Sequence, residues 1–154
     1  MHRLIPFLAC FLLAIALPGA AWSQNKIYRQ VPNDAIEKVL KGLDLKYETG
    51  KDKKSEATYY DFKRGEIFYR LYNYGADLWI ETTYEKKMDL DDVNRWNAEA
   101  KFSRLVRLEQ KDKNPTLSLE YQLDCSGGVA EATIRQYVNR FDEEARKFVK
   151  FMAK

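Results

Sequence analysis

The sequence predicts an α+β domain in which an antiparallel sheet carries helices packed on one face. Apolar residues alternate with polar ones from Leu117 to Leu123, which is the pattern of a strand buried on one side. Beyond a glycine pair, apolar residues recur at helical spacing from Ile134 to Met152. Three aromatic-rich segments between residues 57 and 84 are separated by glycine turns, as in an antiparallel meander. The expected order of elements is α-β-β-β-α-β-β-α.

The first 23 residues predict a secretory signal peptide. The positive pair His2-Arg3 precedes a nearly unbroken apolar run from Leu4 to Leu17, and a small-x-small motif ends at Ser23. We expect cleavage after Ser23, with cleavage after Ala21 as the alternative. The apolar run is shorter than the roughly 20 residues that a spanning helix needs, so we expect no stable membrane span after cleavage. The mature chain is therefore expected to be periplasmic or secreted.

Removal of the leader restricts the chemistry of the remaining chain. His2 is the only histidine and Cys10 leaves as well, so Cys125 is the single thiol that remains. Histidine-dependent nucleophilic sites and zinc sites of the His or Cys type are therefore excluded. We expect a protein that is not an enzyme, with no catalytic residue, metal or cofactor. The Cys125 thiol is expected to pack as a small residue at a strand end, with a reactive thiol of lowered pKa as the alternative.

The charges of the chain do not favour a nucleic-acid partner. Lys and Arg number 26 against 23 Asp and Glu, and the formal net charge is +3. The two signs are mixed along the sequence, as in the run at residues 51–54, whereas nucleic-acid binding needs a concentrated basic face. We therefore expect no nucleic acid, whereas the expectation of a protein partner or a homodimer rests on the aromatic residues of the sheet.

The N-terminal half is expected to supply a helix and the meander. Residues 24–33 are predicted to form a loose N-terminal arm that precedes a single domain at residues 34–154. The helix begins near Asp34, carries an apolar stripe as far as Leu43, and precedes an optional short strand at residues 45–48. Aromatic and β-branched residues then define three strands, at Ala57–Lys63, Glu66–Tyr74 and Ala76–Tyr84.

The C-terminal half is expected to supply a second helix, a hairpin and the final helix. Asp89 is a good N-cap for a helix that ends near Lys101. The hairpin strands are predicted at Phe102–Glu109 and Pro115–Asp124, joined by a polar turn at residues 111–114. The apolar face of the second helix is predicted to contain Leu90, Val93 and Trp96.

A set of short motifs occurs in a fixed order along the C-terminal half of the chain. Its residues are Asn94, Arg95, Trp96, Asn97, Phe102, Arg104, the segment Asp124–Val129, Phe141 and Phe148. This ordered set resembles the YbjN family, which is described as bacterial sensory-transduction regulators. The resemblance covers roughly residues 34–152 and is strongest from Asn94 to Val129. It implies a fold similar to that of type III secretion chaperones, and a chaperone-like or regulatory protein-binding role. The best-known members of the family lack a leader, so the signal peptide is a departure.

Structural roles are expected for the most prominent motif residues. Asn94 and Asn97 flank Trp96 near a helix end, where an asparagine side chain can bond free carbonyls or the adjacent strand. Gly127 and Gly128 are expected to let the chain reverse without a Cβ clash. A phosphate-binding loop is the alternative for the glycine pair, but no lysine follows it as nucleotide loops require.

The candidate functional site is the sheet face predicted to lie away from the helices. Alternation places four aromatic residues and two charged ones on this face, which is the composition of an interaction surface. The hypothesis is that the face binds a second protomer or an exported polypeptide. The residues are Tyr59, Phe68, Arg70, Tyr72, Trp79 and Glu81.

Two structural explanations and one functional alternative compete with this hypothesis. The Ile27-Tyr28 segment of the arm could cover the aromatic face, or cross-strand aromatic pairs could simply stabilise the meander. The functional alternative is a small-ligand sensor or carrier with a pocket between helix and sheet.

Overall fold

The computed structural model describes residues 26–109 and 115–153. The predicted signal peptide at residues 1–23 and the predicted turn at 111–114 lie outside the described residues. The helices and longer strands follow the predicted order along the chain, but two short strands, β1 and β8, were not predicted, and the optional strand exists as β2. The elements are β1 (Ile27–Tyr28), α1 (Asn33–Gly42), β2 (Tyr47–Lys51), β3 (Thr58–Arg64), β4 (Ile67–Asn73), β5 (Asp77–Tyr84), α2 (Leu90–Glu99), β6 (Arg104–Leu108), β7 (Thr116–Asp124), β8 (Val129–Ala130) and α3 (Glu131–Met152).

Six strands form one antiparallel sheet in the order β2-β3-β4-β5-β7-β6. Strands β2 to β5 are neighbours in sequence and in space. Gly65 and Gly75 turn the chain between strands with φ of 60° and 82°, which glycine adopts without steric cost. β7 then inserts between β5 and β6, so that the later strand occupies the inner position and β6 lies at the edge. The other edge is β2.

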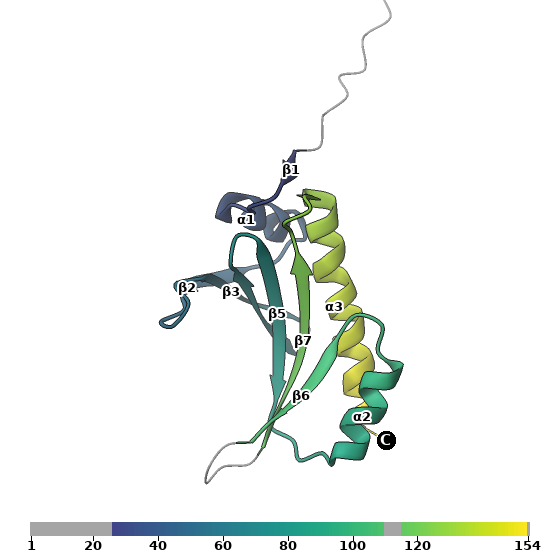
Figure 1. Cartoon of the computed structure of the whole chain (residues 1–154). Helices are drawn as coiled ribbons and strands as arrows, with labels where there is room; N and C mark the ends of the chain where they lie inside the picture. The colour runs from purple at the N-terminus through teal and green to yellow at the C-terminus, as the bar shows by residue number, and fades with distance from the viewer. Residues whose placement is uncertain (1–25, 110–114, 154) are drawn as a thin grey trace, which may run out of the picture.

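The helices pack on one face of this sheet. Figure 1 shows α3 running along the sheet, with α1 near one end of it and α2 near the other. Tyr60, Leu71, Ile80 and Tyr121 lie opposite one another on β3, β4, β5 and β7 and form one row of the buried face. The first three are fully buried, and the Tyr121 ring lies 4.7 Å from that of Tyr137 on α3. Burial of each such side chain contributes about 1.5–3 kcal/mol, so this row holds the sheet against α3.

The N-terminal segment is part of the fold, so the prediction of a loose arm is wrong from Ile27 onward. Ile27 and Tyr28 form β1, which pairs with Ala130 and Val129 of β8. Val31 is buried in the core, and its amide donates to the carbonyl of Gly75 at 2.8 Å. Because β1 pairs with β8 beside the start of α3, it does not cover the aromatic face, and that explanation for the face is also wrong.

Helix α2 begins as predicted but exposes one residue that was expected to be buried. The Asp89 carboxylate accepts a hydrogen bond from the Asp92 amide at 2.8 Å, which confirms Asp89 as the N-cap. Val93 and Trp96 are buried, whereas Leu90 is 61% exposed. Leu90 is the first residue of the helix, and the buried residues of α2 are Val93 and Trp96.

Candidate functional site

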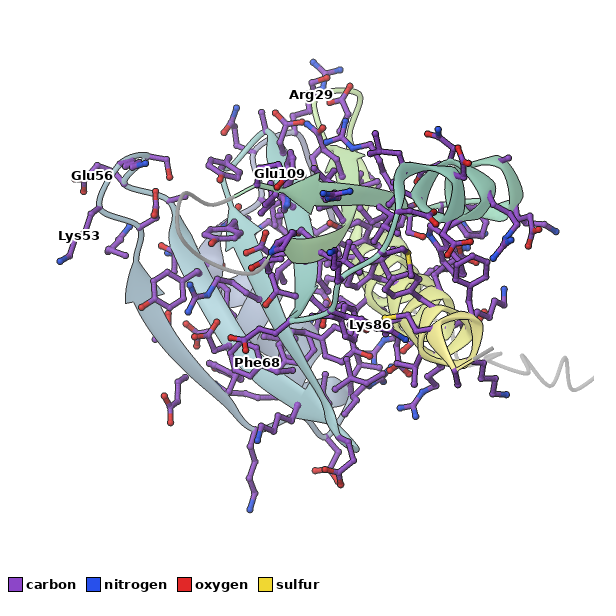
Figure 2. The ribbon with its side chains drawn as sticks, turned by 90° about the horizontal axis from the view of Figure 1, so that it is seen from below. Arg29, Lys53, Glu56, Phe68, Lys86 and Glu109 are labelled. Carbon is purple, nitrogen blue, oxygen red and sulfur yellow. The ribbon has the colours of Figure 1, made fainter. Side chains whose placement is uncertain are left out.

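All six residues of the predicted site lie on the sheet face opposite the helices, which we call the open face. β3, β4 and β5 each alternate between buried and more accessible residues, and the six belong to the accessible set. Figure 2 shows Phe68 over the strands and well apart from α2 and α3. The site is not a bare aromatic patch. Of its six residues only Phe68 is exposed, at 43%, and the other five, Arg70 and Glu81 included, are half-buried.

One half of the open face is organised around Arg70. Its guanidinium donates two hydrogen bonds to the Asp61 carboxylate, each at 2.6 Å, and lies 4.3 Å from the centre of the Tyr59 ring. These hydrogen bonds raise the pKa of Arg70, so the side chain stays charged. Bidentate pairing combined with stacking on an aromatic ring fixes the guanidinium in one place.

The other half contains a carboxylate with a weaker set of partners. The Tyr72 hydroxyl donates to Glu81 at 3.3 Å, and burial raises the pKa of the Glu81 carboxyl. Glu120 lies directly opposite Glu81 and accepts a hydrogen bond from Arg104 at 2.9 Å. The Arg104 guanidinium also lies 6.0 Å from the centre of the Trp79 ring.

The strand register places charged residues in a row across all six strands. Sequence reasoning did not find this row, because its members come from strands that are distant in sequence and align only through the pairing of β5 with β7. Four carboxylates and two guanidiniums make it acidic, although the whole chain is slightly basic. From β2 to β6 the row contains Glu48, Asp61, Arg70, Glu81, Glu120 and Arg104.

Aromatic residues form a second row beside the charged one. Tyr59 lies directly opposite Tyr72, with ring centres 6.3 Å apart in an edge-on arrangement, and Trp79 is the next residue of the row. The Tyr72 ring also stacks on Tyr74 at 6.1 Å, and Tyr74 is 46% exposed. The contact of Tyr59 with Tyr72 is a cross-strand pair of the kind that contributes to sheet stability, whereas Tyr72 and Tyr74 are two residues apart in sequence.

The two asparagines of the helix motif have different surroundings. Asn97 donates to the Leu105 carbonyl at 3.0 Å and accepts from the Leu105 amide at 2.7 Å, which fastens α2 to the edge strand β6. This is the contact with an adjacent strand that the sequence predicts. Asn94 is exposed. Trp96 between them packs against the Phe148 ring at 4.9 Å.

The glycine pair and the cysteine have structural surroundings. Gly128 has a φ of 98°, and a Cβ on it would lie 2.7 Å from the Ile27 side chain, while Gly127 has open space around it. Of these two neighbouring positions, Gly128 requires glycine and Gly127 does not. Cys125 is fully buried, and burial together with two nearby carboxylates raises its pKa to about 11. The thiol thus has none of the lowered pKa that a reactive cysteine shows.

The described residues offer little for the other kinds of site. Between residues 26 and 153, leaving out 110–114, no group of three or more His, Cys, Asp or Glu residues could hold a metal ion. In the same part of the chain, no helix combines the length and the apolar character needed to cross a membrane. The space between α3 and the sheet is filled by side chains without solvent exposure, among them Leu78, Ile80, Phe141 and Phe148. The small-ligand pocket between helix and sheet therefore stays a prediction.

Comparison with known proteins identifies the family. The family model of YbjN, described as "Putative bacterial sensory transduction regulator", matches residues 32–154. The crystal structure of YbjN from E. coli, titled "a putative transcription regulator", matches with a TM-score of 0.60 at 14% identity, over 75% of this chain and 86% of that one. A comparison with curated proteins found no match. The family description names a regulator and no enzymatic activity, and the fold and the matched residues together show that this chain belongs to the YbjN family.

Proposed function

We propose that this protein is an exported regulatory module that binds a polypeptide through the open face. The observation that carries the proposal is the arrangement of the sheet, whose three described helices lie on one side. The other side presents Tyr59, Tyr72, Trp79 and Arg70, which are residue types that dominate the binding energy of protein interfaces. Phe68 on β4 and Tyr74, which directly follows β4, add exposed aromatic surface.

The half-buried state of the face favours a selective contact over general hydrophobic adhesion. Arg70 covers Tyr59, and Arg104 lies over Trp79, so charged side chains shield much of the aromatic surface from water. A partner must therefore complement both the rings and the charges. Two occupants are compatible with this surface. One is an exported polypeptide, which would give the protein a chaperone-like role, and the other is a second protomer.

The binding part of the proposal can be tested by removing two rings from the open face. The purified protein is examined by light scattering, and the polypeptides that co-purify with it are identified by mass spectrometry. The double variant Tyr72→Ser, Trp79→Ser should lose the bound polypeptide or the dimer. The variant Leu90→Ser, which truncates an exposed apolar residue on α2, is the matched control and should lose neither. An unchanged assembly in the double variant would show that the open face is not the binding surface.

The export part of the proposal rests on the leader and has its own test. N-terminal sequencing of the protein recovered from the periplasm or medium should give Gln24 as the first residue. A chain that begins at Trp22 would place the cleavage after Ala21 and would still support export. Recovery of the protein only in the cytoplasm with Met1 in place would refute this part of the proposal and leave the binding part standing.

A further inference from the structure

The open face uses one arrangement to hold a guanidinium, and the arrangement is built from two residues of a strand. On β3, Tyr59 and Asp61 are two residues apart and therefore point to the same side. Arg70 donates to the two oxygens of the Asp61 carboxylate from Nε and Nη2, and its guanidinium lies over the Tyr59 ring. The strand thus supplies an aromatic platform and a carboxylate for one arginine.

β5 carries the same pair of groups without an arginine bound to the carboxylate. Trp79 and Glu81 are also two residues apart on the open face, and Glu81 lies directly opposite Arg70 in the register. Among the described residues, no lysine or arginine forms an ion pair with Glu81. Arg70 is engaged by Asp61, and Arg104, which lies over Trp79, is engaged by Glu120.

The surroundings of Glu81 favour the arrival of a positive charge. Burial raises the pKa of Glu81, and repulsion from its cross-strand neighbour Glu120 adds to this effect, while the nearby charge of Arg70 opposes it. The Ser118 hydroxyl is fully buried close to Glu81 and acts to lower the pKa of that carboxyl, which favours its charged form. A carboxylate that is partly desolvated and lacks an ion-pair partner gains more from an incoming cation than an exposed one does.

A shallow groove of about 310 Å³ lies beside Trp79 and is lined in part by Trp79, Glu120 and Gln122. Glu81 is not part of this lining, but it lies directly opposite Glu120, which is. Lys101 and Arg104 also line the groove and oppose a cation there. The Arg104 side chain is 67% exposed, and the carboxylates of the charged row outnumber the guanidiniums.

We propose that Trp79 and Glu81 bind the guanidinium of an arginine in an extended segment of the partner polypeptide. The guanidinium stacks on the Trp79 ring and donates to the Glu81 carboxylate, which repeats on β5 the arrangement that Arg70 makes on β3. Arginine fits better than lysine, because a planar guanidinium can stack on a ring and bond a carboxylate with two donors at once. This inference rests on the proposed function and names the chemistry that the partner brings.

The test uses a blocked pentapeptide, acetyl-Thr-Val-Arg-Val-Thr-amide, added to the purified protein and followed by NMR. The indole N–H signal of Trp79 should move with increasing peptide, while the signal of the buried Trp96 should stay in place and report an intact fold. The same peptide with citrulline, which keeps the shape of arginine without its charge, should bind at least about tenfold more weakly. Equal binding of the citrulline peptide, or no movement of the Trp79 signal, would overturn the proposal.

Variants separate this site from diffuse attraction to the acidic row. Glu81→Gln keeps an acceptor for Tyr72 and removes the charge, and it should weaken the arginine peptide about tenfold or more. Glu48→Gln removes the same charge from the same row at the exposed edge strand, and it should change binding less than twofold. Equal losses in the two variants, or none in Glu81→Gln, would contradict a specific site at Glu81.

The same variants distinguish this inference from the proposed function. If the double variant at Tyr72 and Trp79 loses its natural polypeptide while Glu81→Gln retains it at full strength, the open face binds a partner but the arginine assignment is wrong. If the double variant retains its polypeptide, the proposed function itself fails. Loss of the natural polypeptide in Glu81→Gln, together with the peptide result, supports both.

Discussion

The contact between Asn97 and the edge strand β6 leads to a quantitative prediction. Replacing Asn97 with alanine removes both side-chain hydrogen bonds to the Leu105 backbone, at 2.7 and 3.0 Å. A net contribution of about 0.5–1.5 kcal/mol for each bond gives roughly 1–3 kcal/mol. Water can reach this partly exposed edge and replace some of the loss, so we expect a decrease of about 1–2 kcal/mol in the free energy of unfolding.

Asn94 provides the matched control for this prediction. Both asparagines lie within α2, so each alanine substitution brings the same gain in helix propensity, about 0.5 kcal/mol. The difference between the two variants therefore isolates the contact with Leu105. The measurement is urea unfolding followed by far-ultraviolet circular dichroism, with the slope of the transition checked for constancy. A difference below about 0.5 kcal/mol between the variants would refute the reasoning.

The glycine elbow and the buried thiol give two further predictions. Gly128→Ala should destabilise the protein by more than about 1 kcal/mol in urea unfolding, since its φ is positive and its Cβ would meet Ile27, whereas Gly127→Ala should have little effect. The Cys125 pKa of about 11 in the folded protein lies above that of an unfolded thiol, so its contribution to stability is full below pH 9 and is lost as the pH rises toward 11. The difference in the free energy of unfolding between the native protein and Cys125→Ala should therefore shrink over that interval. A difference that grows would contradict a raised pKa for Cys125.

Local patterns predicted the strands of the meander closely. The third meander strand was expected at Ala76–Tyr84 and is observed at Asp77–Tyr84, because alternation and glycine turns are both readable over a few residues. The same alternation placed Trp79 and Glu81 on the open face. Side-chain periodicity depends only on neighbouring residues, so this part of the fold and of the candidate site required no knowledge of the rest.

Features that depend on distant parts of the chain were not predicted. A strand of two residues has no measurable period, so the pairing of Ile27–Tyr28 with β8 left no signal in the sequence. The charged row requires the exact register of β5 on β7, which brings Glu81 opposite Glu120 across nearly forty positions of sequence. Arg70 and Arg104 lie over the Tyr59 and Trp79 rings, and composition alone cannot reveal such contacts.

The inner position of β7 has a consequence for folding during synthesis, when the N-terminal part of the chain appears first. Strands β2 to β5 appear first, yet β5 lacks its second neighbour and the apolar face of the meander lacks its cover until Thr116–Met152 has followed. Until then, the unpaired edge of β5 and the apolar side chains of β4 and β5 are open to wrong partners. The sheet cannot be completed before almost the whole chain is available, so the last segment to be synthesised is the one that commits the chain to the native state.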